Sequence, residues 1–455
     1  MPVALALFTS DLRLHDNPVL RAAVRAGDRV VPLFVVDSGV AAAGFAAPNR
    51  SAFLAGCLAD LDEGLRARGG RLVVRRGDVV EETCRVAAAA DAAEVHVAGG
   101  VSGYAHRREA RLRAALEADG RRLRVHDAVV TVVAPGEVAP TGKDHFAVFT
   151  PYFRRWSAEP PRAVADPPRR VDVPEVDGLP VPSAADLGAG GAAPGLPRGG
   201  EREGRRRLTA WLRNGVDRYA DLHDDLAADA TSRLSAYLHF GCLSPLEVVT
   251  RARGNDSPGA EAFVRQLAWR DFHHQVLAAR PRAAAADYRT RHDRWRRDAG
   301  EFDAWRAGHT GYPVVDAAMR QLAHEGWTHN RARMIVASFL AKTLHHDWRE
   351  GARHFLRHLV DGDLANNQLN WQWMAGTGTD TRPNRILNPV VQGRRFDPGG
   401  DYVRRWVPEL AGVPGPAVHE PWKLPAAVRS GLRYPEPLVD LAEALARFRA
   451  ARGLD

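Results

Sequence analysis

The first 130 residues alternate between short apolar runs and longer amphipathic segments. Five runs rich in Val, Leu and Phe predict buried strands, over residues 3–8, 30–36, 72–74, 94–98 and 123–126. Between them, apolar residues recur every three or four positions and predict helices, over 17–26, 50–68, 79–90 and 107–119. This alternation favours a doubly wound, Rossmann-like parallel α/β sheet, on which ligands sit beyond the carboxyl ends of the strands. The turns after the first two strands hold neither a GxGxxG sequence nor a P-loop, which argues against a dehydrogenase-type dinucleotide site.

The pattern changes twice after residue 130. Residues 131–200 are crowded with Pro, Gly and Ala and predict a long interdomain linker over the surface, which an aromatic segment at 143–156 anchors to one of the domains. From 201 to 455 helical periodicity returns and strand signals largely vanish. We therefore expect an α/β domain over 1–130, a linker over 131–200 and an all-α domain over 201–455. Its helices are predicted over 203–213, 245–252, 260–279, 313–325, 330–346 and 348–358.

Composition limits the kind of protein. A length of 455 residues allows two or three domains, and a net charge of +8 permits an anionic partner such as nucleic acid, although Arg-rich solvated surfaces are common. Three widely spaced cysteines suggest neither a disulfide framework nor a zinc site and fit a reducing cytoplasm. No signal peptide and no apolar run of about 20 residues is present, so we expect a cytoplasmic protein without a membrane span.

The most unusual stretch is DGDLANNQLNWQW at 361–373, which holds two carboxylates, three asparagines and two tryptophans. It indicates either a pocket that hydrogen-bonds a polar aromatic ligand between indole walls or a buried polar network. Arg333 is a candidate counter-ion for Asp361 or Asp363. The hydroxyl-rich segment 229–235 either binds phosphate near a helix start or caps a helix. The His pairs at 273–274 and 345–346 lack metal-ligand spacing, so we predict no metal site.

Several motifs recur in a fixed order along the chain. They are FTSDLRLHDNP at 8–18, TSRLS at 231–235, WRDF at 269–272, TGYPVVDAAMRQL at 310–322, GWTHNRARM at 326–334, DWREG at 347–351, the stretch at 361–373, and FDPGGDYVRRWVPEL at 396–410. Their joint order and spacing resemble the photolyase/cryptochrome flavoprotein family nearly end to end. The likeness is greatest to the bacterial class I branch that repairs cyclobutane pyrimidine dimers and carries a deazaflavin antenna.

The resemblance implies FAD folded into a U shape in the helical domain. By position, its phosphates and ribose would be held by Tyr219, Thr231, Ser232, Leu234 and Ser235. The isoalloxazine and adenine would be surrounded by Arg270, Asn330, Arg333, Asp361, Asp363 and Asn367, with Asn367 near flavin N5. The protein's part in such a site is to orient the cofactor and tune its electronics.

The resemblance also implies a substrate, UV-damaged DNA whose pyrimidine dimer is flipped out of the stack into the pocket. Trp269 and Trp373 would pack on the dimer, and Gln266, Asn330, Arg331 and Met334 would contact it. In the family, blue light drives an electron from reduced FAD to the dimer. Trp371, Trp348 and Trp295 match the electron-hopping positions, although core packing alone also accounts for three tryptophans.

Two positions depart from the cyclobutane-dimer pattern. Gln266 stands where that branch has Glu, as in the (6-4) branch, and His223 stands where Arg is common. The (6-4) branch, however, has His at the positions of Asn330 and Met334, because its chemistry needs a proton donor. We therefore predict cyclobutane-dimer repair. A (6-4) photolyase remains an alternative, as does a cryptochrome-type receptor, whose usual long C-terminal tail is not found here.

The N-terminal domain would carry an antenna chromophore. A composition typical of a high-GC genome favours 8-hydroxy-5-deazaflavin over methenyltetrahydrofolate. The expected cleft residues are Ser10, Phe34, Asp37, Arg50 and Cys57, for each of which an ordinary core or loop role is nearly as probable on sequence. We expect a monomer.

Overall fold

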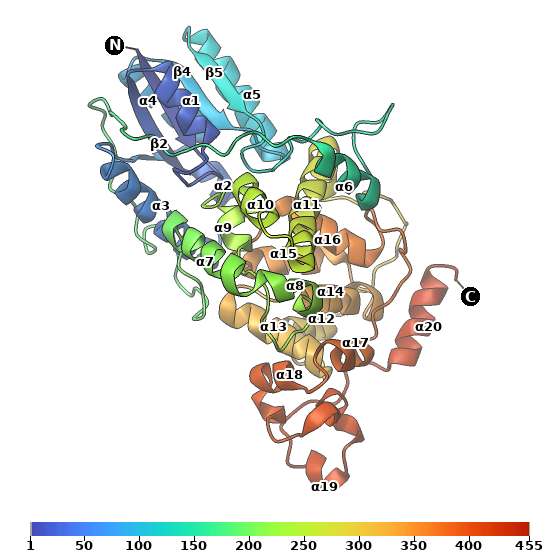
Figure 1. Ribbon diagram of the computed structural model, residues 1–455. Helices are drawn as coiled ribbons and strands as arrows, with labels where there is room; N and C mark the ends of the chain where they lie inside the picture. The colour runs from blue at the N-terminus through green and yellow to red at the C-terminus, as the bar shows by residue number, and fades with distance from the viewer. Residues whose placement is uncertain (1, 455) are drawn as a thin grey trace.

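The computed structural model describes residues 2–454 and places a parallel sheet at the N-terminal end of the molecule (Figure 1). The sheet has the order β3-β2-β1-β4-β5, which confirms the doubly wound α/β prediction. Its strands are β1 Val3–Phe8, β2 Arg29–Asp37, β3 Val73–Gly77, β4 Ala92–Ala98 and β5 Arg122–His126. The helices of this domain are α1 Pro18–Ala26, α2 Ser38–Ala42, α3 Pro48–Arg66, α4 Val79–Ala89 and α5 Gly103–Ala118.

The central strand β1 is buried along its whole length, as a near-continuous apolar run in a parallel sheet should be. The strand order reverses direction between β1 and β4, which is where ligands bind on open α/β sheets. Here the segment after β1 instead meets the second domain, because Leu12 donates its N–H to the carbonyl of Phe240 at 3.1 Å. Gly241 has φ +68°, and a β-carbon there would lie 2.0 Å from the carbonyl oxygen of Ser10. The two domains are therefore in close backbone contact at this end of the sheet.

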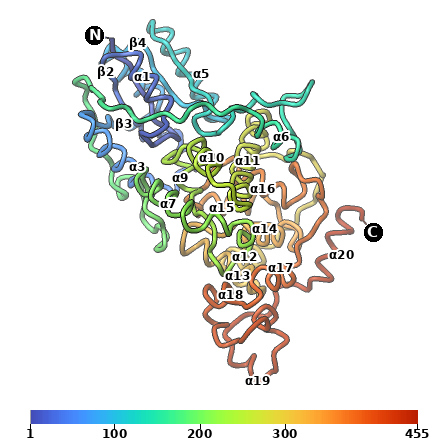
Figure 2. The backbone as a smooth tube through the Cα atoms, viewed as in Figure 1, coloured from blue at the N-terminus to red at the C-terminus, as the bar shows by residue number. Residues whose placement is uncertain are grey.

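Residues 131–200 carry one helix, α6 Phe149–Ala158. The prediction that its aromatics anchor the segment is confirmed, because the ring of Phe149 stacks on Trp269 at 3.7 Å between centroids and Trp156 donates its indole N–H to Asp271 at 3.0 Å. After α6 the chain returns to the sheet, where Leu179 pairs with Val74 of β3, and then passes α3 to the next helix (Figure 2). The segment thus bridges both domains.

The rest of the chain is helical. Its α-helices are α7 Glu201–Asn214, α8 Tyr219–Leu222, α9 Ser235–His239, α10 Pro245–Arg253, α11 Pro258–Ala279, α12 Ala299–Ala307, α13 Pro313–Glu325, α14 Asn330–Ser338, α15 Trp348–His358, α16 Leu364–Ala375, α17 Pro389–Phe396, α18 Asp401–Trp406, α19 Ala426–Arg429 and α20 Leu441–Ala451. Within residues 2–454, no helix joins the length and apolarity that crossing a bilayer requires.

The prediction of one helix over 330–346 was wrong. The α-helix α14 ends at Ser338, and a π-helical turn, η3 Phe339–Thr343, follows it. Leu344 donates its N–H to the carbonyl of Phe339 at 2.8 Å, five residues back, and His345 then takes a φ of +59° that ends the helix. A π-turn leaves the apolar periodicity almost unbroken, so the sequence pattern alone does not show it.

Candidate functional site

Two indoles form one wall of the candidate site. Trp269 lies on α11 and Trp373 on α16, and their rings meet edge to face with centroids 5.4 Å apart at an angle of 89°. Both side chains are half-buried. The stacked ring of Phe149 covers one face of Trp269. Two half-exposed indoles at a helix junction can stack on a planar base.

Arg333 pairs with Asp361, as the sequence predicted for one of two possible acids. The Nη2 of Arg333 lies 2.9 and 3.2 Å from the two carboxylate oxygens, and its Nε donates to the carbonyl of Thr328 at 2.8 Å. The Asp361 side chain is only 4% exposed. A pair this buried depends on both partners, since removing one leaves an uncompensated charge.

Asp363 has a different partner, which sequence analysis missed. Its carboxylate accepts from Asn366 N–H at 2.7 Å and so caps α16, while its other oxygen lies 3.2 Å from Nε2 of His274. Burial alone would raise the pKa of Asp363, but His274 and the nearby Arg270 outweigh it and hold that pKa well below its usual range. Asp363 is therefore a fixed negative charge at the start of α16.

Two further histidines surround Asp363. Burial lowers the pKa of His239 and of His273 to about 4. His273 also bonds Asn366 through Nδ1 at 3.0 Å. Sequence analysis noted only that the 273–274 pair lacks metal-ligand spacing, and it did not find the partners Asp363 and Asn366, which lie far along the chain.

The hydroxyl-rich segment fits a phosphorylated ligand. Thr231 Oγ1 is buried and, within residues 2–454, has no hydrogen-bond partner. Such an orphan is costly unless a ligand or water satisfies it. Of the other residues expected around the phosphates and ribose, Tyr219 is buried and Leu234 is almost fully buried. Ser235 starts the short helix α9, whose N-cap residue Leu234 makes no side-chain capping hydrogen bond.

Trp327, in the motif at 326–334, lies among the charges of the site. The guanidinium of Arg233 sits 4.2 Å from its ring centroid, and that of Arg333 sits 6.0 Å away. Arg233 in turn bonds Asp229 at 2.7 Å. The motif GWTHNRARM marks this tryptophan, but only the fold brings Arg233 to it.

Asn367 and Arg270 are held by backbone carbonyls. Asn367 is 8% exposed and donates through Nδ2 to Ala352 at 3.0 Å, which fixes the amide. Arg270 donates to the carbonyls of Val130 and Leu238. Its charge thus lies at the junction of α9, α11 and the segment that follows β5.

The remaining predicted substrate residues lie nearer solvent. Gln266 and Asn330 are exposed, and Met334 is half-buried. Arg331 forms an ion pair with Asp224, with Nη2 2.5 Å from Oδ2, and lies 4.4 Å from the ring centroid of Phe396. Arg331 is therefore partly neutralised before any anion binds.

The three predicted electron-transfer tryptophans differ in burial. Trp371 and Trp348 are buried, at 3% and 0% exposure, and Trp295 is half-buried beside His345. Trp348 donates its indole N–H to Asp287 at 2.9 Å. The ring of Trp371 contacts Phe355 at 5.2 Å and a further indole, Trp305, at 6.1 Å. Trp305 was not among the predicted residues.

The expected antenna residues have different surroundings. Ser10 is exposed, Phe34 is buried in β2, and Asp37 caps α2 and accepts from Tyr104. Arg50 donates to Leu359 at 2.9 Å, across the domain interface. Cys57 is fully buried with its Sγ 3.3 Å from that of Cys242.

Across residues 2–454, no three His, Cys, Asp or Glu side chains are arranged to hold a metal ion.

A Rossmann-like sheet, a helical domain, and a polar site walled by two indoles define a two-domain nucleotide-cofactor protein.

Comparison with known proteins gives the family. Residues 4–171 match the family model of DNA photolyase, and residues 263–453 match that of the FAD binding domain of DNA photolyase. The deoxyribodipyrimidine photo-lyase of Streptomyces griseus is 67% identical over 457 residues, covering 100% of both chains. The chain belongs to the DNA photolyase family.

Solved structures agree with this assignment. A bacterial class III photolyase from Agrobacterium tumefaciens superposes with a TM-score of 0.91 at 33% identity, covering 99% of this chain and 97% of the other. An archaeal photolyase from Sulfolobus tokodaii with two FAD molecules superposes with a TM-score of 0.84 at 30% identity, covering 100% of both chains.

Proposed function

We propose that this protein is a deoxyribodipyrimidine photo-lyase, which uses blue light and reduced FAD to split cyclobutane pyrimidine dimers in DNA by electron transfer. The observation that carries the proposal is the 67% identity to the Streptomyces griseus photo-lyase over the whole chain. The edge-to-face pair of Trp269 and Trp373 supports it, because a flipped dimer needs aromatic surface to replace the stacking it loses.

The residues of the helical domain fit FAD. The cofactor supplies the light-absorbing electron donor when it is bound. Thr231 offers an unpaired hydroxyl, and the Arg333–Asp361 pair places one positive and one negative charge in the same part of the site. The amide of Asn367, fixed on Ala352, would present its oxygen without adding charge. These residues bind and orient; splitting the dimer needs no general acid or base from them.

The proposed cofactor set also includes Tyr219, Ser232, Leu234, Ser235, Arg270, Asn330 and Asp363. Gln266, Asn330, Arg331 and Met334 would meet the damaged DNA. Gln266 can hydrogen-bond a pyrimidine but adds no negative charge. Electron supply from the surface would use Trp371, Trp348 and Trp295, whose indoles are oxidisable.

The antenna is a separate proposal. Two candidates come from the sequence, deazaflavin and folate. The archaeal photolyase with two FAD molecules, whose structure implies a novel light-harvesting cofactor, adds a second FAD as a third candidate. Arg50 and Cys57 are already engaged, with Leu359 and Cys242 respectively, which leaves them less free to contact a chromophore. Extraction of the bound chromophores and their absorption spectra would distinguish the three. Because the proposed substrate is DNA, we expect the enzyme in the cytoplasm. We also expect a monomer, as in the sequence-based prediction.

The deciding experiment irradiates the reduced holoprotein with oligonucleotides carrying either a thymine dimer or a (6-4) product. We expect blue light to restore intact thymines from the dimer and to leave the (6-4) product unchanged, as followed by chromatography. Loss of the (6-4) product alone would favour the alternative branch that Gln266 suggests. Persistence of both lesions would favour a light receptor.

A further inference from the structure

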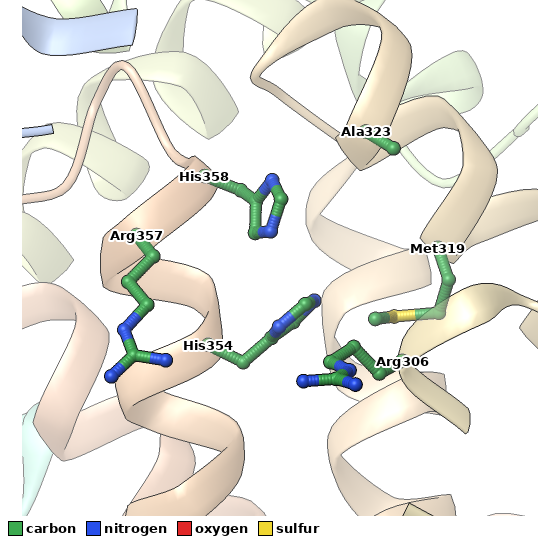
Figure 3. A pocket seen from close by; sticks show the side chains of 6 residues that line it. All are labelled: Arg306, Met319, Ala323, His354, Arg357 and His358. Atoms are coloured by element: carbon green, nitrogen blue, oxygen red, sulfur yellow. The ribbon is translucent and has the colours of Figure 1, made fainter. Parts of the chain in front are cut away.

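A pocket on the far side of α15 is not used by the proposed function. It lies between the C-terminal half of α15 and the helices α12 and α13, is partly open to solvent, and has a volume of about 320 Å³. Figure 3 shows its lining: Arg306, Met319, Ala323, His354, Arg357 and His358. None of these six belongs to the proposed cofactor, dimer or electron-transfer sets. The volume falls in the range of small-molecule sites.

The lining is rich in nitrogen donors and contains no carboxylate. His354 extends from α15 toward Arg306 and Met319 (Figure 3), and its ring lies 4.5 Å from that of His358. Arg306 pairs with Asp303 at 2.8 Å, on its own helix. Arg357 is exposed and, within residues 2–454, forms no ion pair, so it is free of a protein carboxylate. Four side chains can thus donate to one anion while one acid opposes them.

The histidines act as donors rather than as further charges. Burial, followed by His358, Arg306 and Arg357, lowers the pKa of His354 to about 3. Burial also lowers the pKa of His358. A neutral imidazole still donates one N–H, and two guanidiniums add bidentate geometry suited to a tetrahedral dianion. Met319 and Ala323 of α13 supply an apolar wall across the pocket from the two histidines of α15 (Figure 3).

We propose that this pocket binds a small phosphomonoester, with its phosphate among Arg306, His354, Arg357 and His358 and its organic group against Met319 and Ala323. The site also touches the aromatic interior. The ring of His354 lies 5.4 Å from that of Trp305, which in turn contacts Trp371. A bound dianion would therefore place negative charge two aromatic contacts from a tryptophan of the proposed electron path.

Titration calorimetry of the FAD-loaded protein tests the proposal, with inorganic phosphate and phenyl phosphate as probes at constant ionic strength. We expect saturable binding at one site, with phenyl phosphate the tighter ligand. Arg306→Gln and Arg357→Gln should each weaken it about tenfold or more, because each guanidinium would donate charge-assisted hydrogen bonds to the phosphate. Arg357→Lys should recover part of the loss.

Arg353→Gln is the matched control, since Arg353 is exposed on the same helix but does not line the pocket. It should leave phosphate binding unchanged. Absence of saturable binding, or an equal loss in Arg353→Gln, would overturn the proposal. The phosphate could instead belong to DNA. If the pocket binds a small ligand, Arg306→Gln and Arg357→Gln should weaken binding of an undamaged duplex no more than Arg353→Gln does. A larger loss of duplex affinity in the two pocket variants would also overturn the proposal.

Discussion

The backbone of Gly351 in α15 lies against the indole of Trp371 in α16, so close that a β-carbon on Gly351 would stand 2.3 Å from the ring. The packing of Trp371 therefore requires glycine at this position of the DWREG motif, because any larger residue would have to displace the indole ring. Trp371 is 3% exposed and is fixed from its other sides by Trp305 and Phe355.

Gly351→Ala should therefore destabilise the protein and slow light-driven reduction of bound oxidised FAD. The higher helix propensity of Ala would raise the free energy of unfolding by about 1 kcal/mol, but overpacking the buried ring would lower it by about 1–3 kcal/mol. We therefore expect a net loss of stability. Urea unfolding and flavin absorbance under illumination measure the two effects. Gly300→Ala, at an exposed position in the first turn of α12, is the control and should be neutral or stabilising. Unchanged photoreduction in Gly351→Ala would contradict the role of Trp371.

The wall formed by Trp269 and Trp373 leads to a second prediction. Trp373→Ala should weaken binding of dimer-containing DNA about 5- to 150-fold, because stacking of a base on an aromatic ring contributes about 1–3 kcal/mol. Trp373→Phe keeps a ring and should retain most of the affinity. Gel-shift titrations with damaged and undamaged oligonucleotides separate the effects. A comparable loss for undamaged DNA would show that Trp373 does not read the flipped dimer.

The sequence predicted what depends on local pattern. Its strands fall on the five observed ones, since buried parallel strands read as apolar runs bounded by turns. It failed at 330–346, where the π-turn at Phe339 preserves the apolar period while ending the α-helix. Local pattern could not find the pairing of Asp363 with His274 or of Arg233 with Trp327 either, because each joins elements distant along the chain. The sequence analysis named Arg50 only as an expected antenna residue, and local pattern could not show that it donates across the domain interface to Leu359.

The buried imidazole of His273 predicts a dependence of stability on pH. Burial lowers its pKa to about 4, despite the hydrogen bond to Asn366, while an unfolded histidine titrates near ~6.5. Above pH ~6.5 the ring is neutral in both states. As the pH falls from ~6.5 to ~4, the unfolded chain takes up a proton that the folded protein does not. The free energy of unfolding should therefore fall by about 3 kcal/mol over this interval from His273 alone.

His273→Gln removes this titration. Chemical unfolding at a series of pH values should show a slope smaller than wild type by up to about 1.4 kcal/mol per pH unit between ~6.5 and ~4. His106→Gln, at an exposed position on α5, should leave the slope unchanged. An unaltered slope in His273→Gln would mean that the folded protein protonates this ring as readily as the unfolded chain does.

The ion pair between Arg331 and Asp224 allows the proposed DNA contact to be tested in both directions. If Arg331 contacts a DNA backbone phosphate, that phosphate competes for the guanidinium with Asp224, whose Oδ2 lies 2.5 Å from Nη2 of Arg331. Asp224→Asn should then strengthen DNA binding and steepen the dependence of log affinity on log salt, whereas Arg331→Gln should weaken binding and reduce that slope by about 0.9. Asp221→Asn makes the same change of charge on a nearby exposed side chain and should shift affinity without the same change in slope. Fluorescence anisotropy with a labelled duplex at several salt concentrations provides the slopes. Equal slopes in Asp224→Asn, Arg331→Gln and wild type would assign Arg331 to the fold, through its partners Asp224 and Phe396, and not to the DNA.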